Sequence, residues 1–241
     1  MKLFNLDSPL MQALSRVADI MLLNVLTFIC CIPIVTAGAS LTAMHYMCLK
    51  MVRNEETYLV RGFFKSFKEN FGQATVIWLI QLVVFFVLGY DFFIMYTAEE
   101  GLNIVLQVLI FIVTILALLT SSFVYPVLAR FVNTVPKTIK NAMFVSIMQL
   151  PKAILNIILS VVPILLVLYV PQVIPLVLFF GLALPAYLHA KLYNKFFKKL
   201  EDRVTEEMGP AEPSTDPDAE DERIFKDELD PALQSIRDDN N

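Results

Sequence analysis

The sequence predicts an all-α protein, a polytopic membrane bundle of helices. Three observations support this. Of the 241 residues, 57% are hydrophobic and 17% charged, whereas about 25% of a soluble domain is charged. Long apolar runs recur along the chain, and Lys and Arg gather in the short segments between them. A backbone that crosses lipid must satisfy its hydrogen bonds within its own segment, so runs of this kind form helices.

Five apolar runs are long enough to cross a membrane. A hydrocarbon core about 30 Å thick needs about 20 residues of helix. The runs cover residues 17–35, 74–95, 102–126, 153–170 and 172–190. Each is therefore expected to be a transmembrane helix.

The stretch over residues 36–52 decides whether there is a sixth. It is rich in small and hydroxyl side chains, and Gly38 and Thr42 stand four residues apart on one helix face. Small faces of this kind let helix backbones approach closely in a membrane. A short helix returning from a turn at Pro33 gives six transmembrane helices, which we predict. The alternative, in which the stretch does not cross, gives five.

The basic residues predict the orientation. Residues 50–68 carry five Lys or Arg and residues 130–152 carry four, while the loop around Glu99 and the turn at residues 169–173 carry none. Short loops rich in Lys and Arg stay in the cytoplasm. The two basic segments are therefore expected on the cytoplasmic side of the cell membrane, together with the C-terminus and, in the six-helix arrangement, the N-terminus.

Two segments on the cytoplasmic side are expected to be amphipathic helices lying at the membrane surface. Phenylalanines recur at helical spacing within residues 63–74, between Lys and Glu side chains. Within residues 135–152, Ile139, Met143 and Ile147 form a similar apolar face beside lysines. Helices with one apolar and one basic face bind the headgroup region.

Charge divides the chain into two parts. Residues 1–199 hold 15 Lys or Arg against 8 Asp or Glu, and residues 200–241 hold 4 against 15. The acidic part has too few apolar side chains to fold alone. We predict a transmembrane domain over residues 1–200 and an acidic, largely disordered cytoplasmic tail over residues 201–241. The tail is either a solubilising segment or, through residues 222–233, a short helix that docks on a partner or on the basic inner face of the protein itself.

No motif for nucleophilic, phosphate-binding or metal chemistry is present. Asp19 and Asp91 are expected at opposite ends of the bundle, so they form no carboxylate pair. Cys30, Cys31 and Cys48 lie in apolar or small-residue runs without the spacing of a zinc site. We expect no enzyme activity, no cofactor and no metal. Nucleic acid is not an expected partner, because membrane topology already accounts for the basic loops.

Polar side chains inside the apolar runs indicate an alternative function, that of a small-solute transporter or channel. Ionisable and amide groups in a membrane either bond neighbouring helices or line a path. The side chains that would line a midplane cavity are His45, Gln81, Gln107 and Asn156. The prolines that would kink the surrounding helices are Pro126, Pro163 and Pro185. For His45, a packing role is the simpler interpretation.

Several short motifs resemble a known family. They are Pro33-x-x-Thr36-x-Gly38-Ala39, Arg53-x-Glu55, Phe63-Phe64, Phe67-Lys68-x-Asn70-Phe71, Tyr125-Pro126-x-x-Ala129-Arg130-Phe131 and Lys140-Asn141-Ala142. Together they resemble the YesL family, a group of bacterial membrane proteins carried as a domain of unknown function. The resemblance covers roughly residues 3–200 and implies no catalytic residue.

The resemblance implies an accessory role in carbohydrate uptake, because YesL-family members are often encoded beside carbohydrate transporters. The expected partners are the lipid bilayer and subunits of a carbohydrate ABC transporter or a sensor kinase. An accessory protein predicts that Arg53, Glu55, Asn70, Arg130 and Asn141 cluster on the inner side. The candidate functional or structural residues are Pro33, Thr36, Gly38, His45, Arg53, Glu55, Asn70, Arg130 and Asn141.

Overall fold

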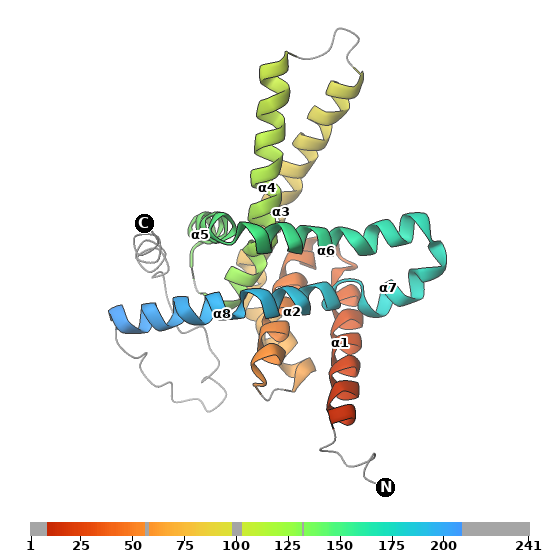
Figure 1. Cartoon of the computed structure of the whole chain (residues 1–241), viewed down its shortest axis with the longest axis vertical. Coiled ribbons are helices and arrows are strands. Elements are labelled where there is room, and N and C mark those ends of the chain that lie inside the picture. Colours follow the sequence, from red (N-terminus) through yellow and green to blue (C-terminus); the bar gives the residue numbers. More distant parts are fainter. Residues whose placement is uncertain (1–8, 56–57, 98–102, 132, 209–241) are drawn as a thin grey trace.

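The computed structural model describes residues 9–55, 58–97, 103–131 and 133–208, and in these residues every regular element is helical (Figure 1). The α-helices are α1 (Pro9–Cys31), α2 (Ala37–Arg53), α3 (Leu59–Thr97), α4 (Ile104–Arg130), α5 (Val135–Met148), α6 (Leu150–Tyr169), α7 (Ile174–Phe180) and α8 (Ala183–Met208). Single 3-10 turns, Ile34–Thr36 and Pro171–Val173, join α1 to α2 and α6 to α7. The predicted all-α class is confirmed.

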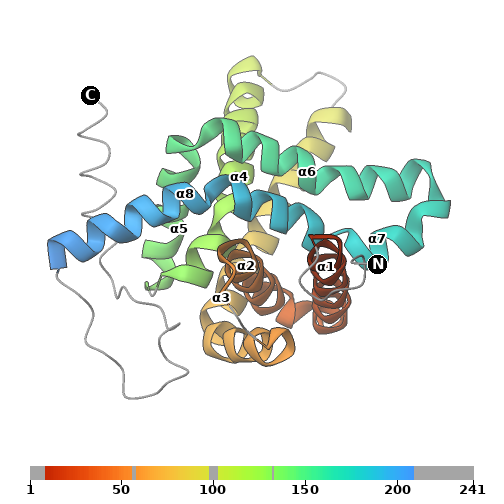
Figure 2. The ribbon, with the colours of Figure 1, turned by 60° about the horizontal axis from the view of Figure 1, so that its bottom comes forward.

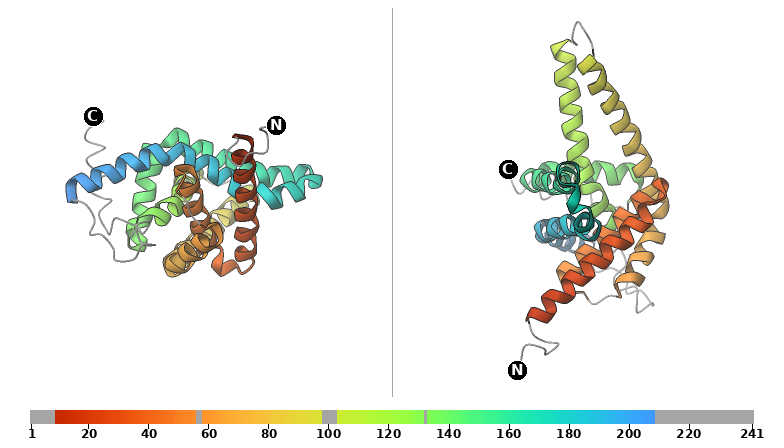
Figure 3. Two further views of the ribbon diagram at one scale, coloured as in Figure 1. Left: turned by 90° about the horizontal axis from the view of Figure 1, so that it is seen from below. Right: turned by 90° about the vertical axis from the view of Figure 1, so that its right-hand side faces the viewer.

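Two groups of helices surround a central α2. The first arm is the hairpin of α3 and α4, and the second arm consists of α6, α7 and α8 (Figure 1). Helix α2 contacts α1, α3, α4 and α8, and Figure 2 shows it lying among them. Helices α3 and α4 form a long hairpin, and the arm of α6, α7 and α8 runs across this hairpin (Figure 1). The right-hand view of Figure 3 shows the second arm nearly end-on beside the upright hairpin. The two arms therefore do not run parallel to one another.

Four of the described helices are long and apolar enough to cross a membrane, namely α1 (over Met11–Cys31), α3, α4 and α6. A fifth span results if Pro171–Phe180 and Ala183–Arg203, which meet at a bend of 51°, count as one. The protein is thus a multi-pass membrane protein with four or five candidate spans. Helix α2 is not among them, so the sixth span predicted over residues 36–52 is not shown.

Helix α2 packs so closely against α3 that the backbones of the two helices are in contact at Gly38. A Cβ atom added to Gly38 would lie 2.4 Å from the carbonyl oxygen of Ala74 and 2.6 Å from Cβ of Trp78, both on α3. Ala39 and Ala43 are fully buried. A helix enclosed by protein has no need of large apolar side chains all round, which explains why this stretch is so poor in them.

Residues 63–74 do not form a separate surface helix. They belong to α3, a continuous helix of 39 residues. No proline interrupts it, so the amphipathic segment continues directly into the apolar one. Phe63 is buried, while Phe64 and Phe71 are each 38% exposed. The segment therefore packs one face on the protein.

Helix α5 packs mainly with its small and polar face. Thr138, Asn141 and Val145 are buried, whereas Ile147 is 44% exposed. Small and polar side chains allow α5 to approach α4 closely. Of the apolar face predicted from Ile139, Met143 and Ile147, Ile139 packs partly against the core, Met143 is half-buried and Ile147 is exposed.

Candidate functional site

Pro33 and Thr36 close the connection between α1 and α2. The Oγ1 hydroxyl of Thr36 donates to the carbonyl oxygen of Pro33 at 2.8 Å. Nε1 of Trp78 donates to the carbonyl oxygen of Ile34 at 2.7 Å, which fastens the turn to α3. Pro33, Thr36 and Gly38, the second residue of α2, thus position α2 against α3.

Two arginines and one glutamate join the C-terminal ends of α2 and α4 to α8. Arg53 donates from Nη2 and Nη1 to Glu201 Oε1 and Oε2 at 2.8 and 3.1 Å. Arg130 donates from Nε and Nη2 to the same two oxygens at 2.8 and 3.0 Å. The exposed fractions of the three side chains are only 6, 10 and 13%. Charges this buried are tolerated because both guanidiniums bind the carboxylate in two-pronged fashion.

The structure brings together part of the predicted inner cluster. Arg53 and Arg130 share Glu201, and Glu55 Oε1 lies 4.0 Å from Arg53 Nη1. Asn70 and Asn141 are buried instead on α3 and α5. Asn70 Nδ2 donates to the carbonyl oxygen of Ser66 at 2.8 Å, within its own helix. We call the end of the molecule that holds Arg53, Arg130 and Glu201 the basic end.

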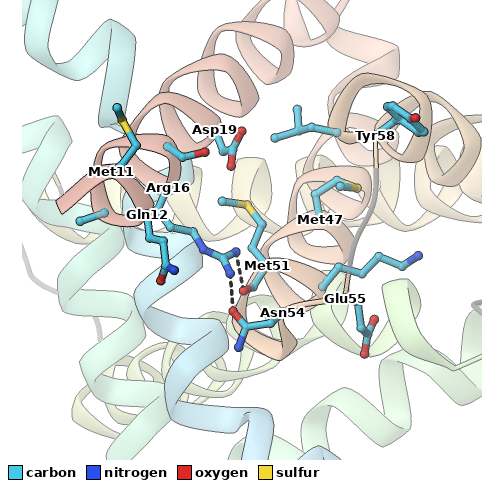
Figure 4. A pocket seen from close by; sticks show the side chains of 13 residues that line it. Met11, Gln12, Arg16, Asp19, Met47, Met51, Asn54, Glu55 and Tyr58 are labelled. Atoms are coloured by element: carbon cyan, nitrogen blue, oxygen red, sulfur yellow. Dashed lines mark hydrogen bonds between the residues drawn. The ribbon is translucent and has the colours of Figure 1, made fainter. Parts of the chain in front are cut away.

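A pocket of about 1090 Å³ opens beside this cluster, between α1 and the end of α2 (Figure 4). Its lining residues are Met11, Gln12, Ala13, Ser15, Arg16, Asp19, Met47, Lys50, Met51, Asn54, Glu55, Tyr58 and Leu59. Charges of both signs face it, from Arg16 and Lys50 and from Asp19 and Glu55. We refer to it as the basic-end pocket.

Arg16 holds one wall of the basic-end pocket in place. Its Nη1 donates to the carbonyl oxygen of Met51 at 2.7 Å, and its Nη2 donates to Asn54 Oδ1 (Figure 4). Asn54 ends α2 in the left-handed conformation, with φ 56°. Tyr58 at the opening is 84% exposed. An exposed tyrosine beside fixed charges is typical of protein contact surfaces.

A second cavity, of about 350 Å³, lies between α2, α4, α6 and α8. Its polar lining residues are His45, Ser121, Ser122, Tyr125, Asn156 and Ser160. Its apolar and glycine lining residues are Leu41, Met44, Leu118, Ile157, Val161, Ile164, Gly181, Leu182, Pro185 and Ala186. None of these is a carboxylate, lysine or arginine. We refer to it as the bundle cavity.

His45 is part of an aromatic cluster behind the bundle cavity. Its ring centroid lies 6.3 Å from that of His189. Phe123 and Tyr193 pack on His189 at 4.9 and 4.8 Å. Nδ1 of His45, both ring nitrogens of His189 and the hydroxyl of Tyr193 are buried without a hydrogen-bond partner in the described chain. Buried polar atoms nearly always find water or another polar partner, so this region is suited to hold polar groups.

Amide side chains of the candidate transport path bond neighbouring helices. Asn156 Nδ2 donates to the carbonyl oxygen of Ser122 at 3.2 Å, and Gln81 Nε2 donates to Ser121 Oγ at 2.9 Å. Tyr125 donates its hydroxyl proton to Gln81. Gln107 does not line the bundle cavity. Of the four residues expected around a midplane cavity, two therefore line it, and Gln81 reaches it through its bonding partners.

Arg16, Asn24 and Glu201 have structural positions that their sequence context does not reveal. Asn24 stands in an apolar run and predicts no more than an interhelical hydrogen bond. Glu201 opens the acidic segment, so it falls within the predicted tail although α8 continues to Met208. The one available signal for Glu201 is that it is the first acid after a run rich in lysine. No three His, Cys, Asp or Glu side chains among the described residues form a possible metal site.

Residues 20–92, from α1 through most of α3, match the family model described as "Protein of unknown function, DUF624". This segment holds Asn24, the turn at Pro33, the buried α2 and Arg53. No curated protein and no solved structure matches the chain. The protein is therefore a multi-pass membrane protein that carries a DUF624 domain of unknown function.

Proposed function

We propose that the protein is a non-catalytic accessory component of a bacterial membrane assembly, and that it contacts its partner at the basic end. The observation that carries this proposal is the basic-end pocket, about 1090 Å³ in volume and lined by both signs of charge. Its opening presents Tyr58, and tyrosine is enriched among the residues that dominate protein interfaces.

The frame around the pocket supports the same proposal. Arg16 fastens α1 to the end of α2, and the pairing of Arg53 and Arg130 with Glu201 fixes α2 to α4 and α8. A surface held in one conformation loses little entropy when a partner binds. The basic end is thus pre-organised for contact.

The finer assignment rests on the resemblance to the YesL family. It makes the partner a subunit of a carbohydrate ABC transporter or a sensor kinase, and it makes the role an accessory one in carbohydrate uptake. The charge rule supports a cytoplasmic location for the basic end, where such subunits meet the membrane.

Affinity purification from the native membrane tests the proposal. We expect Tyr58→Ala to reduce the recovery of co-purifying transporter or kinase subunits at least fivefold. The matched control is Tyr96→Ala, because Tyr96 is 90% exposed near the far end of α3, the helix that begins directly after Tyr58. Equal recovery with both variants, or no co-purifying subunit with the unaltered protein, contradicts the proposal.

Small-solute transport is the second candidate, and the bundle cavity favours it. His45 and Asn156, two of the residues expected around a transport site, line this cavity. Transport sites are commonly placed between helices that include a broken one, and the bend between α7 and α8 lies beside the cavity at Gly181. Solute flux in proteoliposomes that is lost in His45→Ala tests this candidate.

A further inference from the structure

We propose that the bundle cavity binds an uncharged amphiphile that enters from the bilayer, with a hydroxylated head inside and its chains outside. The proposal is independent of partner binding at the basic end. It differs from the transport of an aqueous solute in the route of entry and in the chemistry of the ligand. A diacylglycerol has the chemistry described.

The lining fits an uncharged head. His45, Tyr125, Asn156 and three serines supply hydrogen-bonding groups, and no carboxylate, lysine or arginine faces the cavity. Nδ1 of His45 is buried and bonds no other group of the described chain. Because this nitrogen has no exposed surface, a ligand hydroxyl reaches it only when the His45 ring turns toward the cavity, and the bond formed then is one that the protein does not supply. A phosphate or an ammonium would find no countercharge, and a buried unpaired charge is costly.

The volume and the apolar part of the lining fit the rest of the molecule. Ligand pockets of small molecules measure about 300–1,000 Å³ and are mostly apolar with a few convergent polar groups. The bundle cavity, at about 350 Å³, holds a glycerol-sized head and the beginning of a chain. The remainder of the chains must lie outside.

The mouth of the cavity is flanked by exposed apolar side chains. Leu118 on α4 is 38% exposed, and Val161 and Ile164 on α6 are 41 and 60% exposed. All three line the cavity, and α4 and α6 are both candidate membrane spans. Apolar side chains exposed on such spans face acyl chains. The opening between α4 and α6 is therefore an entry from lipid, in which ligand chains remain among lipid chains.

Photolabelling in vesicles of phosphatidylethanolamine and phosphatidylglycerol tests the proposal on the full-length protein. The probe is a diacylglycerol with a diazirine in one acyl chain. We expect labelled peptides from α4 and α6, and competition by unlabelled diacylglycerol but not by phosphatidic acid. Competition by free glycerol would show entry from water and would overturn the proposal.

Two variants with one control localise the labelling. Ser160→Phe fills the mouth from an exposed position, and we expect at least a fivefold loss of labelling. Ile158→Phe is the control, since Ile158 is 54% exposed on the same helix and does not line the cavity. His45→Phe retains a ring of similar shape and removes the free nitrogen, so labelling should fall at least threefold while the melting temperature is kept. Labelling equal to that of the unaltered protein in Ser160→Phe overturns the proposal.

Discussion

Asn24 on α1 accepts a hydrogen bond from the backbone N–H of Ala183, the first residue of α8, at 2.7 Å. The same oxygen, Oδ1, accepts from the N–H of Leu182 at 2.8 Å. Nδ2 donates in the other direction, to the carbonyl oxygen of Leu178 on α7 at 2.7 Å. One amide thus satisfies backbone groups on both sides of the bend between α7 and α8.

We expect Asn24→Leu to lower the stability of the protein markedly. Leucine has a similar volume but leaves buried backbone groups unpaired, at a cost of about 1–3 kcal/mol for each. The measurement is thermal unfolding in detergent, in a background where alanine replaces the part-exposed Cys30 and Cys31, with a thiol-reactive fluorogenic dye that reports exposure of the fully buried Cys48.

Thr27→Val is the control for Asn24→Leu. Thr27 is equally buried on α1, and its hydroxyl donates only to the carbonyl oxygen of Leu23 in its own helix, at 2.7 Å. This variant should unfold close to the temperature of the unaltered protein. If both variants unfold at one temperature, the contact at the bend does not stabilise the fold.

Gly38→Ala should destabilise the contact between α2 and α3. The new Cβ would lie 2.4 Å from the carbonyl oxygen of Ala74, which is backbone and cannot turn aside. Overpacking of this kind costs about 1–3 kcal/mol. Gly72→Ala, also in a helix, meets nothing within 4 Å and should raise stability by about 0.5–1 kcal/mol. Melting temperatures that move in the same direction for both variants would contradict this explanation.

The sequence predicts the apolar helices well and their partners poorly. Length and hydropathy suffice to find α3, α4 and α6, because a membrane imposes one dominant constraint on each segment separately. The role of Asn24 depends on a bend more than 150 residues further along the chain. The pairing of Glu201 depends on the ends of α2 and α4 meeting α8 in space, and no local pattern encodes such a meeting.

The difference between local hydropathy and contacts with distant residues also explains why the sixth span predicted over residues 36–52 is not shown. Their composition predicts close packing, and the structure encloses α2 among four helices. Hydropathy alone does not decide whether an enclosed helix crosses the membrane. Similarly, periodicity finds the apolar face of α5, but the small face is the one that meets α4.

Glu201→Gln should be among the most destabilising single substitutions at the basic end. The amide removes the charge that Arg53 and Arg130 share, and loss of one partner of a buried ion pair costs about 3–5 kcal/mol. Asp202→Asn is the matched control, since the neighbouring Asp202 is exposed. Thermal unfolding of both variants in detergent provides the comparison. A melting temperature of Glu201→Gln within a degree of the control would show that the cluster contributes nothing.

The position of Glu201 also determines where the acidic tail can be removed. A chain ending at Leu200 lacks this carboxylate, so it should unfold at about the temperature of Glu201→Gln. A chain ending at Met208 keeps all of α8 and should unfold like the full-length protein. If truncation abolishes the recovery of partner subunits in affinity purification, the loss is therefore attributable to the tail only for the chain that ends at Met208. If the two truncated chains unfold alike, Glu201 does not hold α8.

Cysteine labelling distinguishes the possible membrane arrangements. In a variant without native cysteines, single cysteines replace Ile34, Asn103 and Gln172 at the three turns away from the basic end, and Tyr58 and Lys199 at the basic end. All five positions are exposed. With six crossings, an impermeant maleimide applied to intact cells labels the first three positions. The other two react only after permeabilisation.

Each departure from this labelling pattern shows which helix or arm does not cross the membrane. If the position of Ile34 reacts only after permeabilisation, α2 does not cross and the five-span alternative holds. The position of Gln172 tests the arm of α6, α7 and α8, which runs across the α3–α4 hairpin (Figure 1). Two crossing arms cannot both follow the membrane normal, so both turns reach the outside only if each arm is inclined. Labelling at Asn103 without labelling at Gln172 would mean that the hairpin spans the membrane while the second arm lies within it.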